Sequence, residues 1–131
     1  MTSDMTALPP GSAIGILGSG QLGRMLALAA ARLGFKCHVY SDVAGPAFDV
    51  CDRHTVAPYD DEAALSDFAK SIAVATYEFE NIPVATVEFL DRTVPVRPGA
   101  KALACAQDRI NEKALARRLG AETAPFAPVG S

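Results

Sequence analysis

Short, continuous apolar runs alternate along this chain with stretches in which apolar residues recur every three or four positions. Runs of this kind are typical of strands that are buried on both faces of a sheet. Because strands that alternate with helices favour parallel pairing through right-handed crossovers, the pattern predicts an α/β fold with a doubly wound parallel sheet. The predicted strands cover residues 13–17, 37–40, 54–57, 72–76 and 94–96.

Helical periodicity fills most of the intervening sequence. A helix from Gln21 to Gly34 is marked by Leu22, Met25, Leu26, Ala29 and Leu33. Residues 43–53 show neither period, so we expect irregular structure there. Further helices are predicted from Asp60 to Lys70, from Pro83 through Leu90, over 101–106 and over 107–119, and the tail 123–129 is predicted to be extended.

The first twelve residues are polar and end in Pro9-Pro10-Gly11, so we expect a disordered leader over 1–12. Half of the 131 residues are hydrophobic, which is enough for a buried core. The formal net charge of -3 provides no basic field for nucleic acid. No apolar run approaches the ~20 residues that span a bilayer, and no export signal is present, so we expect a cytoplasmic protein without membrane contact.

Metal and disulfide chemistry are not indicated. The three cysteines and two histidines are widely separated and form no CxxC pair, so we expect reduced thiols and no metal site; they are Cys37, Cys51, Cys105, His38 and His54. The acidic run 60–62 is predicted to cap a helix rather than to bind a metal.

The spacing Gly18-x-Gly20-x-x-Gly23 directly follows a predicted strand and opens a predicted helix. In this context the turn predicts a site for a phosphate-bearing ligand, because glycines allow an anion to approach the N–H groups at the helix start. Asp42, at the end of the second strand, suits a Rossmann-like dinucleotide site. Gln21 and Arg24 instead favour a compact phosphate group. A dinucleotide, another phosphate ligand and a ligand-free turn all remain open from the spacing alone.

Two further groups of charged residues attract attention. Glu78 and Glu80 follow the strand 72–76, where ligands of parallel sheets gather. Glu78 is the stronger candidate for a ligand contact, since Glu80 lies nearer to the next helix start and suits a cap. Arg109 and Lys113 share one helix face, which by pattern alone indicates a solvated surface.

Taken together, three segments closely resemble the N5-carboxyaminoimidazole ribonucleotide synthetase family, the ATPase subunits of phosphoribosylaminoimidazole carboxylase within the ATP-grasp superfamily. The segments are Gly18-Ser19-Gly20-Gln21-Leu22-Gly23-Arg24-Met25, Thr76-Tyr77-Glu78-Phe79-Glu80-Asn81-Ile82-Pro83, and Gln107-Asp108-Arg109 followed by Glu112-Lys113. The family usually has glycine where Ser19 stands. Family chains are also longer, which implies that this chain is an N-terminal fragment.

The resemblance implies a preATP-grasp domain over 13–104 and the start of a truncated ATP-grasp domain over 105–131. It also implies an ATP-dependent ligase of purine biosynthesis that uses Mg²⁺, ATP and bicarbonate to carboxylate aminoimidazole ribonucleotide. By motif, Gly20, Gln21, Leu22 and Glu78 would bind the ribonucleotide and Arg109 would reach ATP. The metal and catalytic residues would lie beyond Ser131, so the chain alone is expected to be inactive. A homodimer is expected for the full-length enzyme.

Two other functions remain possible at this stage. The glycine turn is compatible with the NAD(P)-binding domain of an oxidoreductase, and the fold is compatible with a non-catalytic binding module.

Overall fold

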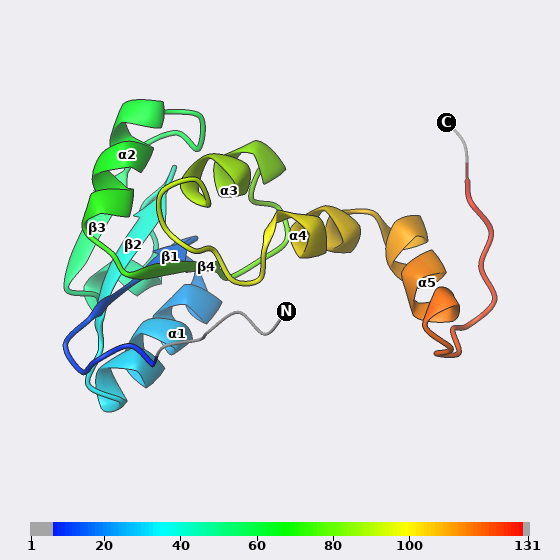
Figure 1. Ribbon diagram of the computed structural model, residues 1–131, viewed down its shortest axis with the longest axis horizontal. Coiled ribbons are helices and arrows are strands. Elements are labelled where there is room, and N and C mark those ends of the chain that lie inside the picture. The colour runs from blue at the N-terminus through cyan, green and yellow to red at the C-terminus, as the bar shows by residue number, and fades with distance from the viewer. Residues whose placement is uncertain (1–6, 130–131) are drawn as a thin grey trace.

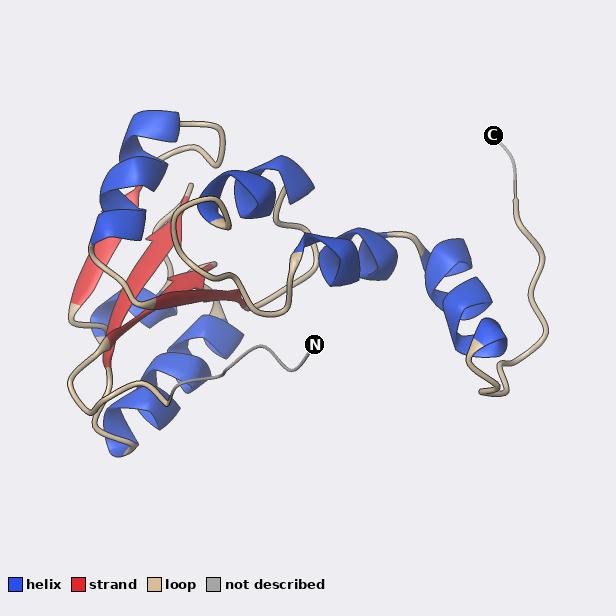
Figure 2. Cartoon of the chain, viewed as in Figure 1, coloured by secondary structure: helices blue, strands red, loops and turns tan. Residues whose placement is uncertain are grey.

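Four parallel strands form the centre of the molecule, in the order β3-β2-β1-β4 (Figure 2). The structure is a computed structural model that describes residues 7–129. The strands are β1 (Ala13–Leu17), β2 (Lys36–Ser41), β3 (Arg53–Val56) and β4 (Val74–Tyr77). The predicted parallel α/β fold is therefore confirmed.

Helices cover both faces of this sheet (Figure 1). The α1 helix (Gln21–Arg32) and the short 3-10 helix η1 (Pro46–Asp49) pack on one face, against Ile16 and Val39. On the other face, α2 (Glu62–Lys70) and α3 (Val84–Leu90) pack against Leu17 and Tyr40. Since successive strand residues point to opposite faces, neighbouring residues of β1 and β2 serve the two cores. The sheet is doubly wound, as predicted.

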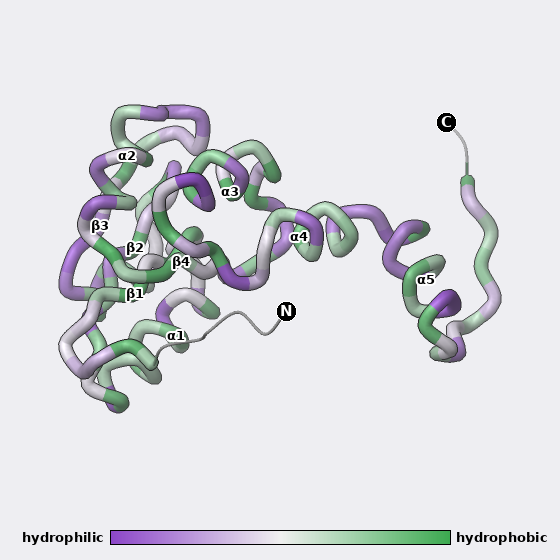
Figure 3. Tube along the Cα trace, viewed as in Figure 1, coloured by the Kyte–Doolittle hydropathy of each residue, from purple (hydrophilic) through white to green (hydrophobic). Residues whose placement is uncertain are grey.

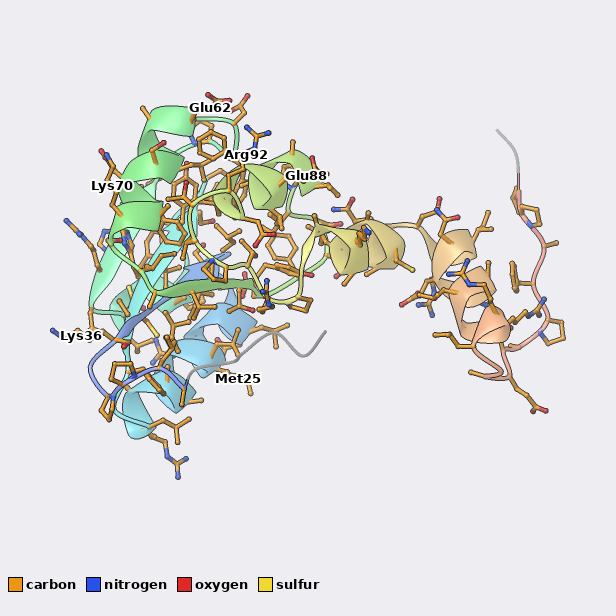
Figure 4. All side chains as sticks on the ribbon, in the orientation of Figure 1. Met25, Lys36, Glu62, Lys70, Glu88 and Arg92 are labelled. Atoms are coloured by element: carbon orange, nitrogen blue, oxygen red, sulfur yellow. The ribbon has the colours of Figure 1, made fainter. Side chains whose placement is uncertain are left out.

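The α1 helix turns its smallest residues toward the sheet. Gly23, Ala27 and Ala30 are buried, which lets the helix approach the strands closely. Its large apolar residues lie outside: Leu22, Met25, Leu26 and Leu28 are all at least 40% exposed, and Met25 projects from the helix in Figure 4. The green stretches of α1 in Figure 3 are therefore largely surface. Helical periodicity located this helix but did not identify its buried face.

Two further helices lead away from the sheet (Figure 1). The α4 helix (Ala100–Gln107) is joined to the core by Leu103, which is fully buried. The α5 helix (Arg109–Arg118) has no buried residue. The extended tail after α5 returns along it, and the Phe126 ring lies against the side chains of Lys113 and Arg117.

Several sequence-based expectations require correction. The predicted strand over 94–96 is reduced to one bridge between Val96 and Ala75, and the segment predicted to be irregular contains η1. The predicted disordered leader is wrong for 9–12, because Gly11 N–H donates to Gly34 O at 2.7 Å and Lys36 N–H donates to Ser12 O at 3.0 Å. Residues 1–6 of that leader lie outside the described residues. Within 7–129, every helix is too short or too polar to cross a bilayer.

Candidate functional site

The glycine turn lies at the carboxyl end of β1, beside the segment that leaves β4. Leu17 O accepts a hydrogen bond from Glu78 N–H at 3.0 Å, and Gly18 N–H donates to Tyr40 O at 2.8 Å. Strand β1 stands between β2 and β4, and the connections that follow β1 and β4 lead to helices on opposite faces of the sheet. In open parallel sheets, this switch point is where a crevice for ligands forms.

Glu78 caps the first turn of α1 from the neighbouring strand. Its Oε1 accepts from Gly20 N–H at 2.7 Å, and its Oε2 accepts from Gly23 N–H. Gly20 is the N-cap residue and has no side chain to satisfy these donors. In a capping box, two side chains accept hydrogen bonds from the N-cap and N3 N–H groups. Here a single carboxylate, from the residue that follows β4, accepts both. The negative charge also lies at the positive end of the helix dipole.

The glycines are required because the Glu78 side chain approaches so closely. A Cβ on Gly18 would lie 2.4 Å from Glu78 Cγ, and one on Gly20 would lie 2.8 Å from Oε1. Gly18 also has φ +108°, a conformation that L side chains rarely adopt. A Cβ on Gly23 would lie 2.6 Å from the Gly18 carbonyl oxygen. All three glycines of the motif thus accommodate Glu78 or the turn itself.

The N–H groups of Gln21 and Leu22 remain available at the helix start. Among residues 7–129, the structure gives neither of them a hydrogen-bond acceptor. Both residues are exposed, and they lie between the two N–H groups that Glu78 occupies. Two adjacent unpaired N–H groups on a helix N-terminus are suited to an oxyanion such as phosphate.

A second set of contacts fixes the turn from the side of β2. The hydroxyl of Ser19 is buried and donates to Val43 O at 2.9 Å, and Ala47 N–H donates to Ser19 O at 2.9 Å. Arg24 donates to Pro46 O at 3.2 Å. The sequence associated both Gln21 and Arg24 with a compact phosphate group. In the structure Gln21 lies at the turn, whereas a guanidinium nitrogen of Arg24 contacts η1 instead.

The motif Gln107-Asp108-Arg109 lies at the junction of α4 and α5. Asp108 caps α5, since its Oδ1 accepts from the N–H groups of Ile110 at 2.8 Å and Asn111 at 3.0 Å. Arg109 pairs with Glu112 on the same helix and is 78% exposed. Gln107, Arg109 and Glu112 border an open hollow of about 470 Å³, together with Glu80 and Asn81.

The structure therefore brings together some predicted site residues and leaves another apart. Gly20, Gln21, Leu22 and Glu78 meet at the turn, whereas Arg109 contacts none of them. Gly20 N–H donates to Glu78 Oε1 and Gly23 N–H donates to Oε2, so the predicted ligand contacts of Gly20 and Glu78 stay predictions. Asp61 accepts from Ala64 N–H at 3.0 Å, which confirms the predicted cap on α2.

The cysteines and histidines lie away from this site. All three cysteines are free thiols. Burial raises the pKa of Cys37 to about 11, so this thiol is protonated at neutral pH and is not a nucleophile. Within 7–129, no cluster of three or more histidine, cysteine or acidic side chains is arranged to hold a metal.

The sheet, the glycine turn and the α4 helix match a known domain family. The model of the ribonucleotide synthetase preATP-grasp domain matches residues 12–107. The chain belongs to this family. The matched residues include the whole sheet, the glycine turn and Gln107.

Relatives of this preATP-grasp domain carry consistent names. The chain is 50% identical over 124 residues to the N5-carboxyaminoimidazole ribonucleotide synthase of Brucella melitensis, covering 94% of this chain and 34% of that protein. The corresponding synthetase structure from Thermus thermophilus matches with a TM-score of 0.80 at 47% identity, covering 88% of this chain and 32% of that one.

A third relative is the crystal structure of N5-carboxyaminoimidazole synthase from Aspergillus clavatus in complex with ADP and 5-aminoimidazole ribonucleotide. It matches with a TM-score of 0.72 at 30% identity, covering 84% of this chain and 30% of that one. The chain thus spans about a third of the length of each of these proteins.

Sequence reasoning missed two features of the site. Strand order brings the segment after β4 beside the turn after β1, but the contact between Glu78 and the glycine N–H groups also depends on how the side chain packs. The contacts of Gln107 and Ser19 had no such signal, since each depends on how a side chain meets distant backbone carbonyls.

Proposed function

We propose that this chain is the ribonucleotide-binding N-terminal part of an ATP-dependent ligase that carboxylates aminoimidazole ribonucleotide to its N5-carboxyamino product. The observation that carries the proposal is the pair of unpaired N–H groups of Gln21 and Leu22 at the switch point of the sheet. The phosphate of the ribonucleotide would accept from these two groups. A relative with the same fold forms a complex with ADP and this ribonucleotide.

Glu78 has two possible contributions to this site. As it stands, its carboxylate stabilises the turn through Gly20 and Gly23 and so holds the Gln21 and Leu22 N–H groups in place. We propose that it also faces the amine or ribose side of the bound ribonucleotide, since a carboxylate with two oxygens has further lone pairs for such donors.

In the reaction we propose, ATP and bicarbonate form carboxyphosphate and ADP. The exocyclic amine of the ribonucleotide then attacks the carboxyl carbon, the bond to phosphate breaks, and inorganic phosphate leaves. This chain would hold the ribonucleotide while the amine reacts. Arg109 would reach the ATP side from α5, where its exposed side chain borders the hollow beside Glu80.

The remaining parts of the reaction are assigned to other sequence. The described residues offer no cluster of acidic or histidine side chains arranged to hold a metal, so they do not fit the Mg²⁺ site that the family implies. We propose that the preATP-grasp domain covers 13–104, that 105–131 begin the ATP-grasp domain, and that this chain alone has no synthetase activity. Bicarbonate, the homodimer and the cytoplasmic location stay predictions.

Calorimetric titration of this chain tests the proposal. We expect saturable binding of aminoimidazole ribonucleotide and no binding of NAD, and we expect Glu78→Gln to weaken the ribonucleotide because an amide retains only one acceptor oxygen. NAD binding without ribonucleotide binding would contradict the proposal. A Glu78→Gln variant with higher affinity would show that the carboxylate repels the nearby phosphate more than it binds the amine or ribose, which would contradict the proposed contact of Glu78 with the ribonucleotide.

The oxidoreductase alternative is not favoured. If the chain were part of an oxidoreductase, its relatives would be named as dehydrogenases. The proteins that match it are instead named as carboxyaminoimidazole ribonucleotide synthases. The glycine turn is also filled on one side by Glu78, which leaves less room for a pyrophosphate along α1. ADP release by the full-length protein, measured with and without the ribonucleotide, would separate a ligase from a non-catalytic binding module.

A further inference from the structure

The side chain of Gln107 joins the end of α4 to the loop that follows Glu78. Its Nε2 donates to Glu80 O at 2.8 Å and to Ile82 O at 2.7 Å. An amide nitrogen has two N–H groups, so both donors are used. This contact crosses 25 residues of sequence, and among the described residues these are the only side-chain hydrogen bonds between α4 and that loop.

The loop at 78–83 is short and is held at both of its ends. Glu78 at its start bonds to the glycine turn, and Ile82 near its end is fully buried in the core. Between them, the structure gives the N–H groups of Phe79, Glu80 and Asn81 no acceptor within 7–129. The two bonds from Gln107 therefore supply the polar restraint on the middle of this loop.

We infer that Gln107 is a positioning residue for the ribonucleotide site, acting through the loop that carries Glu78. By holding the carbonyls of Glu80 and Ile82, it fixes the direction in which Glu78 leaves the sheet, and hence the contact of its carboxylate with Gly20 and Gly23. The inference rests on the proposed function of the glycine turn.

This assignment gives each residue of the motif Gln107-Asp108-Arg109 a different task. Arg109 points from α5 toward solvent and its own neighbour Glu112, whereas Gln107 points back to the sheet domain. Three consecutive residues thus serve the ribonucleotide side, the helix start and the ATP side in turn.

The test uses Gln107→Glu, which keeps the shape of the side chain but replaces both donors by a carboxylate that repels the two carbonyls. Amide hydrogen exchange of Gly20 and Gly23, followed by NMR, reports whether Glu78 still caps the turn. Calorimetry reports the affinity for aminoimidazole ribonucleotide. The matched control is Glu88→Gln, the reverse exchange on an exposed position of α3 (Figure 4).

We expect Gln107→Glu to speed exchange at both glycines and to raise the Kd for the ribonucleotide about tenfold. The control should change neither quantity. Unchanged glycine exchange, or faster exchange with unchanged affinity, would overturn the inference while the proposed function stands. A wild-type chain that fails to bind the ribonucleotide would instead overturn the proposed function, and glycine exchange would then decide the positioning role alone.

Discussion

One carboxylate organises the start of α1, and its neighbours are adapted to it. Glu78 satisfies two backbone donors, at the N-cap and at the third helical position, and leaves the two donors between them open. An anion-binding turn usually exposes all of its N–H groups to the ligand. In this chain half of them are bonded to Glu78, so only the N–H groups of Gln21 and Leu22 are left for the proposed ligand.

The contact with Gly20 can be isolated by comparing two N-cap glycines. Gly20 and Gly99 have nearly the same extended backbone, but an added Cβ meets Glu78 at 2.8 Å in the first case and nothing within 4 Å in the second. We expect Gly20→Ala to lower the free energy of unfolding by about 1–3 kcal/mol more than Gly99→Ala, as measured by urea denaturation.

This difference in the free energy of unfolding should disappear when Glu78 is also replaced by alanine. The side chain that clashes with the new Cβ, and that accepts the hydrogen bonds, is then absent in both variants. Equal costs for both glycines would show that the carboxylate simply moves aside.

His38 is a buried histidine whose protonation state is fixed by its hydrogen bonds. Ser71 donates to Phe68 O at 2.7 Å, so its oxygen accepts from His38 Nδ1–H at 2.6 Å. Nε2 then accepts from the Thr55 hydroxyl at 2.8 Å. Burial, followed by the charges of Arg53 and His54, lowers the pKa of His38 to about 4.

This lowered pKa predicts a loss of stability in mild acid. The unfolded chain takes up the proton near pH 6.5 and the folded chain only near pH 4, so the stabilising effect is complete above pH 6.5 and falls between these values. We expect the free energy of unfolding to fall by up to about 1.4 kcal/mol per pH unit from this group. Urea denaturation at pH 7 and pH 5 should show a smaller loss for His38→Gln, and an equal loss would contradict the assignment.

The α2 and α5 helices have the same kind of N-terminal cap but differ in how many residues they bury in the core. Asp61 and Asp108 both cap a helix through their side chains. However, α2 buries Leu65 and Phe68 in the core, whereas α5 buries no residue. The same local interaction therefore has different consequences for the molecule.

We expect Asp61→Ala to lower the global free energy of unfolding by about 1 kcal/mol. Asp108→Ala should leave the global value unchanged and instead speed amide exchange within 109–118, because α5 opens without disturbing the core. Urea denaturation and hydrogen exchange distinguish the two outcomes. A global loss in Asp108→Ala would mean that α5 contributes to the core after all.

Most elements could be predicted from sequence, because strand and helix periods differ clearly and glycines mark the ends. The exceptions have physical reasons. The α1 helix packs through glycine and alanine, so its leucines, which dominate the pattern, do not face the core. Val96 forms only one bridge because the chain turns away at once, and η1 is too short to show a period.

For the molecule as a whole, sequence and topology go far toward the site. The structure brings Gly20, Gln21, Leu22 and Glu78 together because the turn and the acid follow adjacent parallel strands, while their contacts with a ligand stay predictions. The bond between Glu78 and the glycines was not predicted, because a side chain can face a ligand or its own backbone, and only packing decides. The contacts of Gln107 were not predicted for the same reason: its motif is visible in the sequence, but a polar side chain at a helix end can face solvent or distant backbone carbonyls.

The junction at Asp108 also determines how movement passes through the chain. Asp108 is the single non-helical residue between α4 and α5, with φ -116° and ψ 111°. Turning α5 about this residue breaks no core contact, whereas turning α4 would pull Leu103 from the core and Gln107 from its two carbonyls. A change of backbone angles at Asp108 would therefore reorient α5 without disturbing the glycine turn, whereas a displacement of α4 would break the two bonds that hold the loop after Glu78.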